Sequence, residues 1–187
     1  MVKLESDRLI MRNYRESDLA DYHKMMSDKT NMYWLIELTT SSILESRKSM
    51  EFAMKMNHEG KLRLFCVAAK ENDRLIGAVG CTISAKTPVG HIIDPMGWFI
   101  MQEHQNKGYI TEAVKRVMEY EFLEENCARI VTACFKDNIP TQKVMAKAGF
   151  RKEAEKIKAR WYDGQMRDRL EYAINRDEYL QMHCYKV

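Results

Sequence analysis

The segment between Gly97 and Phe122 constrains the fold most, because its hydrophobic pattern changes period part-way along. The residues from Trp98 to Met101 are large and apolar, which favours a buried strand. From Ile110 onward, apolar residues recur at helical spacing with charged residues between them, which predicts an amphipathic helix. The chain is therefore expected to pass from strand to helix through a polar turn that contains Gly108.

A turn of this kind predicts an anion-binding site. The first N–H groups of the helix have no acceptor inside it, and the helix dipole adds partial positive charge at the same end. A phosphate is the anion that such a helix start binds most often. The turn lacks both G-x-x-x-x-G-K-[ST] and G-x-G-x-x-G, which excludes two common nucleotide loops. These residues by themselves also allow an ordinary connection with one turn glycine.

Length and composition predict one globular domain spanning residues 1–187. The chain is 45% hydrophobic and 30% charged and has only three prolines. It has no run of about 18 apolar residues and no apolar core of a signal peptide near its start. We therefore expect a cytoplasmic protein without membrane contact. A net charge of +3 is too small and too evenly mixed to indicate a nucleic-acid partner.

The cysteines and histidines show no metal-binding pattern. Five cysteines lie without C-x-x-C spacing, and five histidines without H-E-x-x-H. We expect buried free thiols and no metal ion. The cysteines are Cys66, Cys81, Cys127, Cys134 and Cys184.

The order of expected elements indicates a mixed α/β (α+β) fold that does not alternate regularly as a doubly wound fold would. Ser17 and the segment Thr40 to Ile43 are expected to cap the two early helices, and Gly77 and Gly80 to mark bulges or close backbone approach. The expected elements are a strand from Arg8 to Tyr14, helices at 19–26 and 43–60, strands at 62–69, 75–84, 91–101 and 128–135, a helix at 141–147 stopped by Gly149, a strand from Phe150, a strand at 169–174 and a tail helix from Asp177.

Four segments, in order, resemble one family. Gln105-Asn-Lys-Gly-Tyr-Ile110 is similar to the Q/R-x-x-G-x-G/A signature of the GNAT superfamily of acyl-CoA-dependent N-acyltransferases, although Ile110 departs from the usual small residue. Asn138 to Phe150 resembles the N-x-x-S-x-x-V-x-x-K-x-G-F segment of that family. The start, Glu5 to Arg12, and the closing segment, Asp163 to Tyr179, resemble its RimJ/RimL-like branch, named for ribosomal-protein N-terminal acetyltransferases.

The resemblance spans nearly the whole chain and implies the GNAT fold. That fold has a central mixed, mostly antiparallel sheet with splayed strands, flanked by helices. The resemblance further implies an N-acetyltransferase that uses acetyl-CoA as cosubstrate and an amine as acceptor, without direct nucleic-acid binding. Relatives are often dimers, so it also implies a homodimer, although the sequence itself does not determine the oligomeric state.

The resemblance assigns cofactor contacts to two segments. Backbone amides of the loop would hold the pyrophosphate of CoA, and the strand before it would pair with the pantetheine arm. Asn138 would hydrogen-bond the pantetheine, the alternative being a turn former before Pro140. Lys143 would reach the phosphates at the adenosine end, whereas Lys107 is as compatible with a solvated side chain. The loop residues are Gln105, Asn106, Lys107, Gly108, Tyr109 and Ile110, with Thr111 at the helix start, and the strand residues are Phe99, Ile100 and Met101.

The implied reaction is direct attack of an amine on the acetyl thioester. An amide near Ile100 would polarise the carbonyl. Thr141 stands where the branch usually has serine, so its hydroxyl would lie near the sulfur, the alternative being a helix cap. Met145 occupies the position of the tyrosine acid of many GNAT enzymes, so that acid is absent. Glu103 is the candidate base, with Asp94 and His104 as alternatives.

The free energy of deprotonating the acceptor amine favours weakly basic amines. At neutral pH an α-amine with a pKa of about 7.8 costs about 1 kcal/mol to deprotonate, whereas a lysine with a pKa of about 10.4 costs about 4.6 kcal/mol. This cost agrees with the protein N-terminal α-amine that the resemblance to the RimJ/RimL-like branch implies as acceptor, and a small-molecule amine stays open. Two other classes compete: a CoA-binding sensor or scaffold without catalysis, and a basic RNA-binding module.

Overall fold

The computed structural model describes residues 2–60 and 62–184. These residues form two compact units. Unit 1 contains the chain up to Thr82 together with Gly97–Met118, and unit 2 contains Ile83–Met96 together with the chain from Glu119. Three elements run from one unit into the other: strand β4 (Leu75–Thr87), strand β5 (Gly90–Ile100) and helix α3 (Tyr109–Leu123). The expected single domain stays a prediction.

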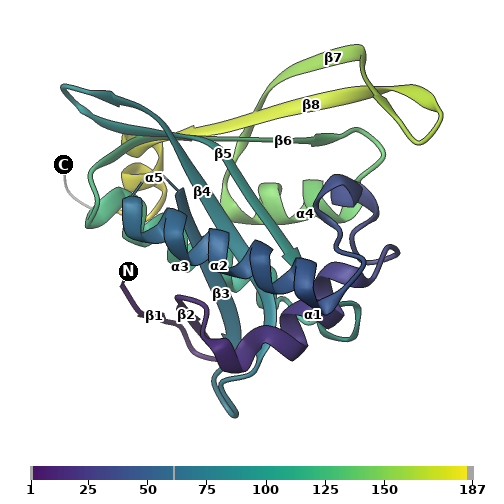
Figure 1. The fold of residues 1–187 in the computed structure, drawn as a ribbon. Coiled ribbons are helices and arrows are strands. Elements are labelled where there is room, and N and C mark those ends of the chain that lie inside the picture. Colours follow the sequence, from purple (N-terminus) through teal and green to yellow (C-terminus); the bar gives the residue numbers. More distant parts are fainter. Residues whose placement is uncertain (1, 61, 185–187) are drawn as a thin grey trace. The chain divides into compact units, whose positions relative to one another are not determined.

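Unit 1 is built on antiparallel strands covered by two helices. Its strand order is β1 (Leu4–Glu5), β2 (Leu9–Arg12), β3 (Leu62–Ala69) and β4. Helices α1 (Leu19–Ser27) and α2 (Ile43–Glu59) pack against each other, and α2 also packs on β3 (Figure 1). Three short 3-10 helices complete the unit: η1 (Glu16–Asp18), η2 (Tyr33–Leu38) and η3 (Gln102–His104). A core rich in methionine and tyrosine lies between these helices and the strands.

The two early helices start in different ways. The hydroxyl of Ser42 accepts the Glu45 N–H at 3.2 Å and caps α2, within the expected segment, and Gly60 ends this helix with a φ of +69°. Ser17 does not cap the first helix, contrary to expectation. The Asp18 carboxylate instead accepts the Arg15 N–H at 2.8 Å and pairs with the buried guanidinium of Arg12. A serine hydroxyl could not neutralise that buried cation.

Neighbouring atoms lie close to both strand glycines. A Cβ added to Gly77 would lie 2.6 Å from the carbonyl oxygen of Phe99, and one added to Gly80 would lie 2.7 Å from the Leu64 side chain. The expectation of close backbone approach is therefore confirmed for Gly77, whereas a side chain approaches Gly80. Strand β4 is longer than expected and continues to Thr87.

Unit 2 contains both parallel and antiparallel strand pairs. Strand β5 pairs in parallel with β6 (Cys127–Phe135) from His91 to Ile93 and then continues to Ile100. Strand β8 (Gln165–Asn175) pairs antiparallel with both β6 and β7 (Arg151–Tyr162). Helix α4 (Ile139–Ala148) has Pro140 in its first turn and ends at Gly149, as expected. The last helix, α5, spans Arg176–Met182.

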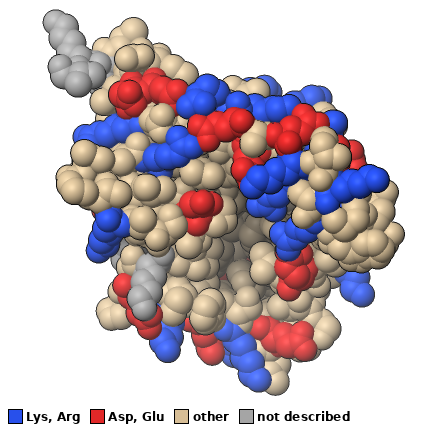
Figure 2. Space-filling view, turned by 90° about the horizontal axis from the view of Figure 1, so that it is seen from above, with Lys and Arg blue, Asp and Glu red and all other residues tan. Residues whose placement is uncertain are grey.

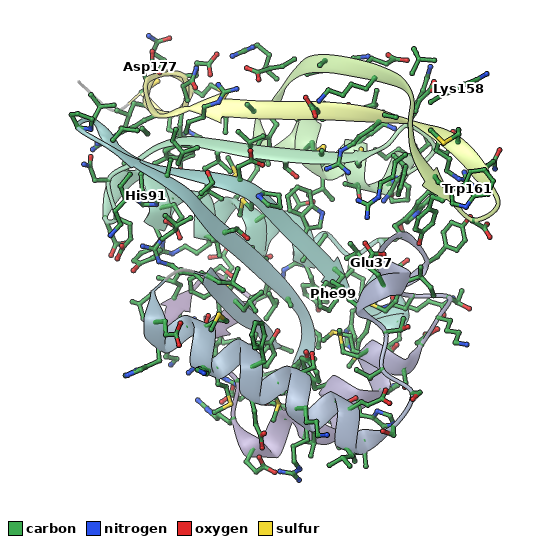
Figure 3. The ribbon with its side chains drawn as sticks, turned by 45° about the horizontal axis from the view of Figure 1, so that its top comes forward. Glu37, His91, Phe99, Lys158, Trp161 and Asp177 are labelled. Carbon is green, nitrogen blue, oxygen red and sulfur yellow. The ribbon has the colours of Figure 1, made fainter. Side chains whose placement is uncertain are left out.

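The hairpin of β7 and β8 is more extended than the sequence predicts. All side chains of β7 before Tyr162 are exposed or half-exposed, and Lys158 and Trp161 point outward (Figure 3). The register of β7 against β8 shifts twice, after Lys152 and after Lys156. Bulges and lysines on an edge strand oppose pairing with another chain.

The charged side chains and the cysteines lie where the sequence predicts, except for Cys184. Basic and acidic side chains are interspersed on the face drawn in Figure 2. Four of the described cysteines are buried and form no disulfide, and burial raises the pKa of the Cys134 thiol to about 11. Cys184 is free but exposed, so the expectation of buried thiols is wrong there. None of the described helices is both long and apolar enough to cross a bilayer.

Candidate active site

The loop between β5 and α3 keeps a run of backbone N–H groups without acceptors. The first α-helical hydrogen bond joins the Glu112 N–H to the Gly108 carbonyl at 3.0 Å. From Asn106 to Thr111, no N–H group has an acceptor within the described residues. The loop is exposed from Gln105 to Gly108. This helix start therefore provides the donors and the dipole that an anion requires.

Backbone conformation, rather than space, explains the loop glycine. Gly108 has a φ of +80°, and Asn106 has a φ of +60°. Asparagine tolerates this left-handed region better than most residues, and glycine adopts it freely. A Cβ on Gly108 would meet the Arg8 side chain at 3.5 Å, which is ordinary contact. Any other residue at position 108 would be strained without being crowded.

Arg8 lies against the same loop. Its Nη1 donates to the Lys107 carbonyl at 3.0 Å, and its guanidinium lies 4.5 Å from the centre of the Tyr109 ring. Its Nε donates to Oε2 of Glu112 at 2.8 Å, while Oε1 of Glu112 accepts the Arg8 N–H at 2.9 Å and the Ser6 hydroxyl at 2.7 Å. Burial acts against ionisation, but these hydrogen bonds lower the pKa of Glu112. The carboxylate therefore stays ionised and fixed.

The strand end before the loop has part of its backbone engaged. The Met101 N–H donates to the Ile76 carbonyl at 2.9 Å, and the Met101 carbonyl accepts the His104 N–H at 2.9 Å. Phe99, which lies on β5 (Figure 3), and Ile100 are therefore better candidates than Met101 for pairing with an extended ligand. The Gln105 N–H also has an acceptor, the Gln102 carbonyl at 3.1 Å.

The candidate base Glu103 has a cationic partner. Lys24 donates to its carboxylate at 2.5 Å, and this hydrogen bond lowers the pKa of Glu103. Its neighbour His104 is half-buried, and burial lowers the pKa of its imidazole. Lys24, Asn31 and Glu103 line a shallow hollow that is open to solvent. The Asn31 side-chain nitrogen is buried there and has no acceptor among the described residues.

The second set of expected residues lies at the start of α4, in unit 2. Asn138 is 8% exposed, and its Oδ1 accepts the Thr141 N–H at 3.3 Å. Asn138 therefore caps this helix. Thr141 is half-buried, Lys143 is exposed and Met145 is fully buried. Asp94, the alternative base, is exposed in the same unit.

Each unit brings together one part of the expected site. Unit 1 holds the loop, the strand end, the exposed Glu103 and the half-buried Thr111. Unit 2 holds the residues of α4. Sequence reasoning missed the contacts of Arg8 and Lys24 with this region. Their partners lie far away along the chain, and the sequence carried no local signal for either pair. No three or more His, Cys, Asp or Glu side chains in the described ranges are grouped to hold a metal ion.

The family model described as "Acetyltransferase (GNAT) domain" matches residues 8–151. The chain belongs to this family. The GNAT protein is 29% identical over 176 residues to the uncharacterized N-acetyltransferase YnaD of Bacillus subtilis, covering 94% of this chain and 98% of YnaD. The family assigns an acetyltransferase enzyme, as the sequence predicted.

Solved structures confirm the GNAT fold. An acetyltransferase (GNAT family) from Bacillus anthracis superposes with a TM-score of 0.79 at 24% identity, covering 94% of this chain and 99% of that one. RimL, a ribosomal L7/L12 alpha-N-protein acetyltransferase solved in complex with coenzyme A, gives a TM-score of 0.78 at 19% identity, covering 93% and 98%. The expected mixed, mostly antiparallel fold and the likeness to RimL-type structures are thus confirmed.

Proposed function

We propose that this GNAT protein transfers the acetyl group of acetyl-CoA to a protein N-terminal α-amine. The observation that carries the proposal is the run of N–H groups from Asn106 to Thr111 without acceptors. Such a run at a helix start suits the diphosphate of CoA. Membership of the family and the coenzyme A bound to RimL support the same cosubstrate.

Contacts to the rest of the cosubstrate follow from the expected residues. Phe99 and Ile100 would pair with the pantetheine amides, and Asn138 would donate its side-chain N–H to the same arm while its oxygen caps α4. Lys107 and Lys143 would meet phosphate oxygens. Gln105 contributes through its side chain, which donates to the Asn31 Oδ1 at 3.2 Å and so positions the loop.

The chemistry requires no covalent enzyme intermediate. The neutral amine nitrogen attacks the thioester carbon, the C–S bond breaks, the nitrogen gives up one proton to water, and the CoA thiolate leaves and takes up one proton. The Ile100 N–H would stabilise the negative charge that develops on the carbonyl oxygen. The Thr141 hydroxyl would donate a hydrogen bond to the leaving sulfur, because the Met145 side chain has no acidic group. The buried cysteines take no part in this reaction.

The hollow beside Glu103 supports a chain end as acceptor. The hollow is shallow and open to solvent. Glu103 stays ionised beside Lys24, so it would attract an ammonium group more readily than it would remove a proton. The Asn31 side-chain nitrogen would donate to the first peptide carbonyl. An α-amine fits because it loses its proton at low cost.

The test is an acceptor panel with acetyl-CoA, followed by release of free thiol. The panel contains peptides with a free N-terminus, the same peptides with a blocked N-terminus and a lysine, and small-molecule amines. We expect turnover above the hydrolysis background with free N-termini only. Turnover confined to small amines would contradict the proposal of a protein N-terminus as acceptor. CoA binding without turnover on any amine would favour a sensor.

A further inference from the structure

We propose that Arg8 is a positioning residue for the diphosphate loop: it orients the peptide before Gly108 and neutralises Glu112 beside the anion site. The proposal rests on the proposed function, because it requires the loop to bind a diphosphate. Arg8 stands about a hundred residues from the loop in the chain, and its side chain has three separate contacts with it. All three lie within unit 1.

The first argument concerns the peptide between Lys107 and Gly108. A trans peptide is planar, so its C=O and N–H groups point in opposite directions. The Arg8 Nη1 donates to the Lys107 carbonyl oxygen at 3.0 Å, along one edge of this planar group. The Gly108 N–H then points from the opposite edge, away from the guanidinium. Contact with the Tyr109 ring at 4.5 Å holds the guanidinium over the first residue of α3 as well.

The second argument concerns charge. A carboxylate in the first turn of a helix stabilises the helix, but it also repels an anion bound at the same N–H groups. Glu112 is such a carboxylate, and Arg8 Nη2 lies 2.7 Å from its Oε2. Both Glu112 oxygens have donors from Arg8 or Ser6. Arg8 therefore removes most of the repulsion that a diphosphate would meet there.

A general role in stability does not account for this arrangement. The side chains of Arg8 and Glu112 are 48% and 19% exposed, and partly exposed ion pairs add little stability. The chain offers a matched pair in Arg74 and Asp21, 69% and 16% exposed, with Nη2 and Oδ1 2.5 Å apart. That pair lies in the same unit, and the Arg74 guanidinium donates to Asp21 and not to the loop.

The experiment compares Arg8→Ala with Arg74→Ala. Calorimetry gives the Kd for CoA, and steady-state kinetics give KM and kcat for acetyl-CoA and for acetyl-pantetheine, which lacks the diphosphate. For Arg8→Ala we expect Kd and the KM for acetyl-CoA to rise about tenfold, with kcat unchanged. Kinetics with acetyl-pantetheine should match the wild type. Arg74→Ala should match the wild type in every assay.

Two further variants separate charge from geometry and guard against misfolding. Arg8→Lys keeps the charge but loses the fork that binds Lys107 and Glu112 together, so its Kd should rise by about threefold. Adding Glu112→Gln to Arg8→Ala removes the uncompensated carboxylate and should recover part of the lost affinity.

The proposal is overturned if Arg8→Ala binds CoA within about twofold of the wild type, or if acetyl-pantetheine kinetics fall equally. Failure of the wild type to bind CoA would instead overturn the proposed function.

Discussion

The starts of helices α3 and α4 use their backbone N–H groups in opposite ways. Both helices follow a strand and a polar turn. At α4, the N–H groups of Ile139, Thr141 and Gln142 all have acceptors, and Pro140 has no N–H to satisfy. At α3, the N–H groups up to Thr111 have none within the described residues.

The difference lies in side-chain capping, which satisfies the start of α4 and leaves the start of α3 open. Asn138 supplies the acceptor at α4, which is the ordinary way to satisfy a helix start. At α3 the nearby side-chain carboxylate of Glu112 is instead occupied by Arg8 and Ser6. Unsatisfied N–H groups cost little while they face water, and they bind strongly once an anion displaces that water.

The largest effect should come from Gly108→Val. The backbone φ of +80° strains a β-branched residue by about 1–3 kcal/mol, and the loop would relax away from its open form. We expect kcat/KM for acetyl-CoA to fall about a hundredfold in steady-state assays. Gly60→Val is the control, since Gly60 has a φ of +69° and nothing within 4 Å of an added Cβ. Equal losses in both variants would mean that strain alone acts.

Thr141→Val tests whether the hydroxyl group in the first turn of α4 takes part in the reaction. The change keeps the side-chain shape and removes the hydroxyl, and a hydrogen bond to a developing thiolate is worth about 1.5–3 kcal/mol. We expect kcat to fall about tenfold or more, with the KM for acetyl-CoA nearly unchanged. Thr141→Ser should retain activity. A Val variant as active as the wild type would remove Thr141 from the mechanism.

Two substitutions of Asn138 separate its role as a helix cap from its proposed role in ligand binding. Asn138→Ala should lower the free energy of unfolding by about 1 kcal/mol, because the cap at Thr141 is lost. Asn138→Asp keeps an acceptor for the cap but has no N–H to donate. If the pantetheine role holds, both variants raise the KM for acetyl-CoA by about fivefold, while only Ala loses stability in denaturant titrations. A normal KM in the Asp variant would limit Asn138 to its cap.

The smallest effect concerns Glu103, just before α3. The hydrogen bond from Lys24 lowers the pKa of Glu103, so its ionised form persists until the pH falls through that lowered pKa. Lys24→Met should raise this pKa toward its ordinary value. The acid limb of the pH profile of kcat/KM should then move to higher pH, with less than about a twofold change at pH 7.5. An unmoved limb would show that Glu103 need not be ionised.

Local signals predicted the boundaries of several elements. Ser42, Gly60 and Gly149 mark helix ends where the sequence placed them, and the strand at 62–69 was predicted to the residue. Ser17 failed as a cap because the chain enters α1 through the 3-10 helix η1, and Asp18 stands at the start of α1 without a cap hydrogen bond from its side chain. The Asp18 carboxylate pairs with the buried Arg12, and that pairing depends on folding rather than on local preference.

The sequence by itself determined the strand, the Gly108 turn and the helix that follows, because backbone preferences and hydrophobic periods act over a few residues. It also determined the family, through four ordered segments. Only the tertiary structure decided which cationic side chain pairs with each carboxylate near the loop. Arg8 meets Glu112 and Lys24 meets Glu103 across long stretches of chain, since packing of unit 1 brings them into contact and no local pattern encodes either pair.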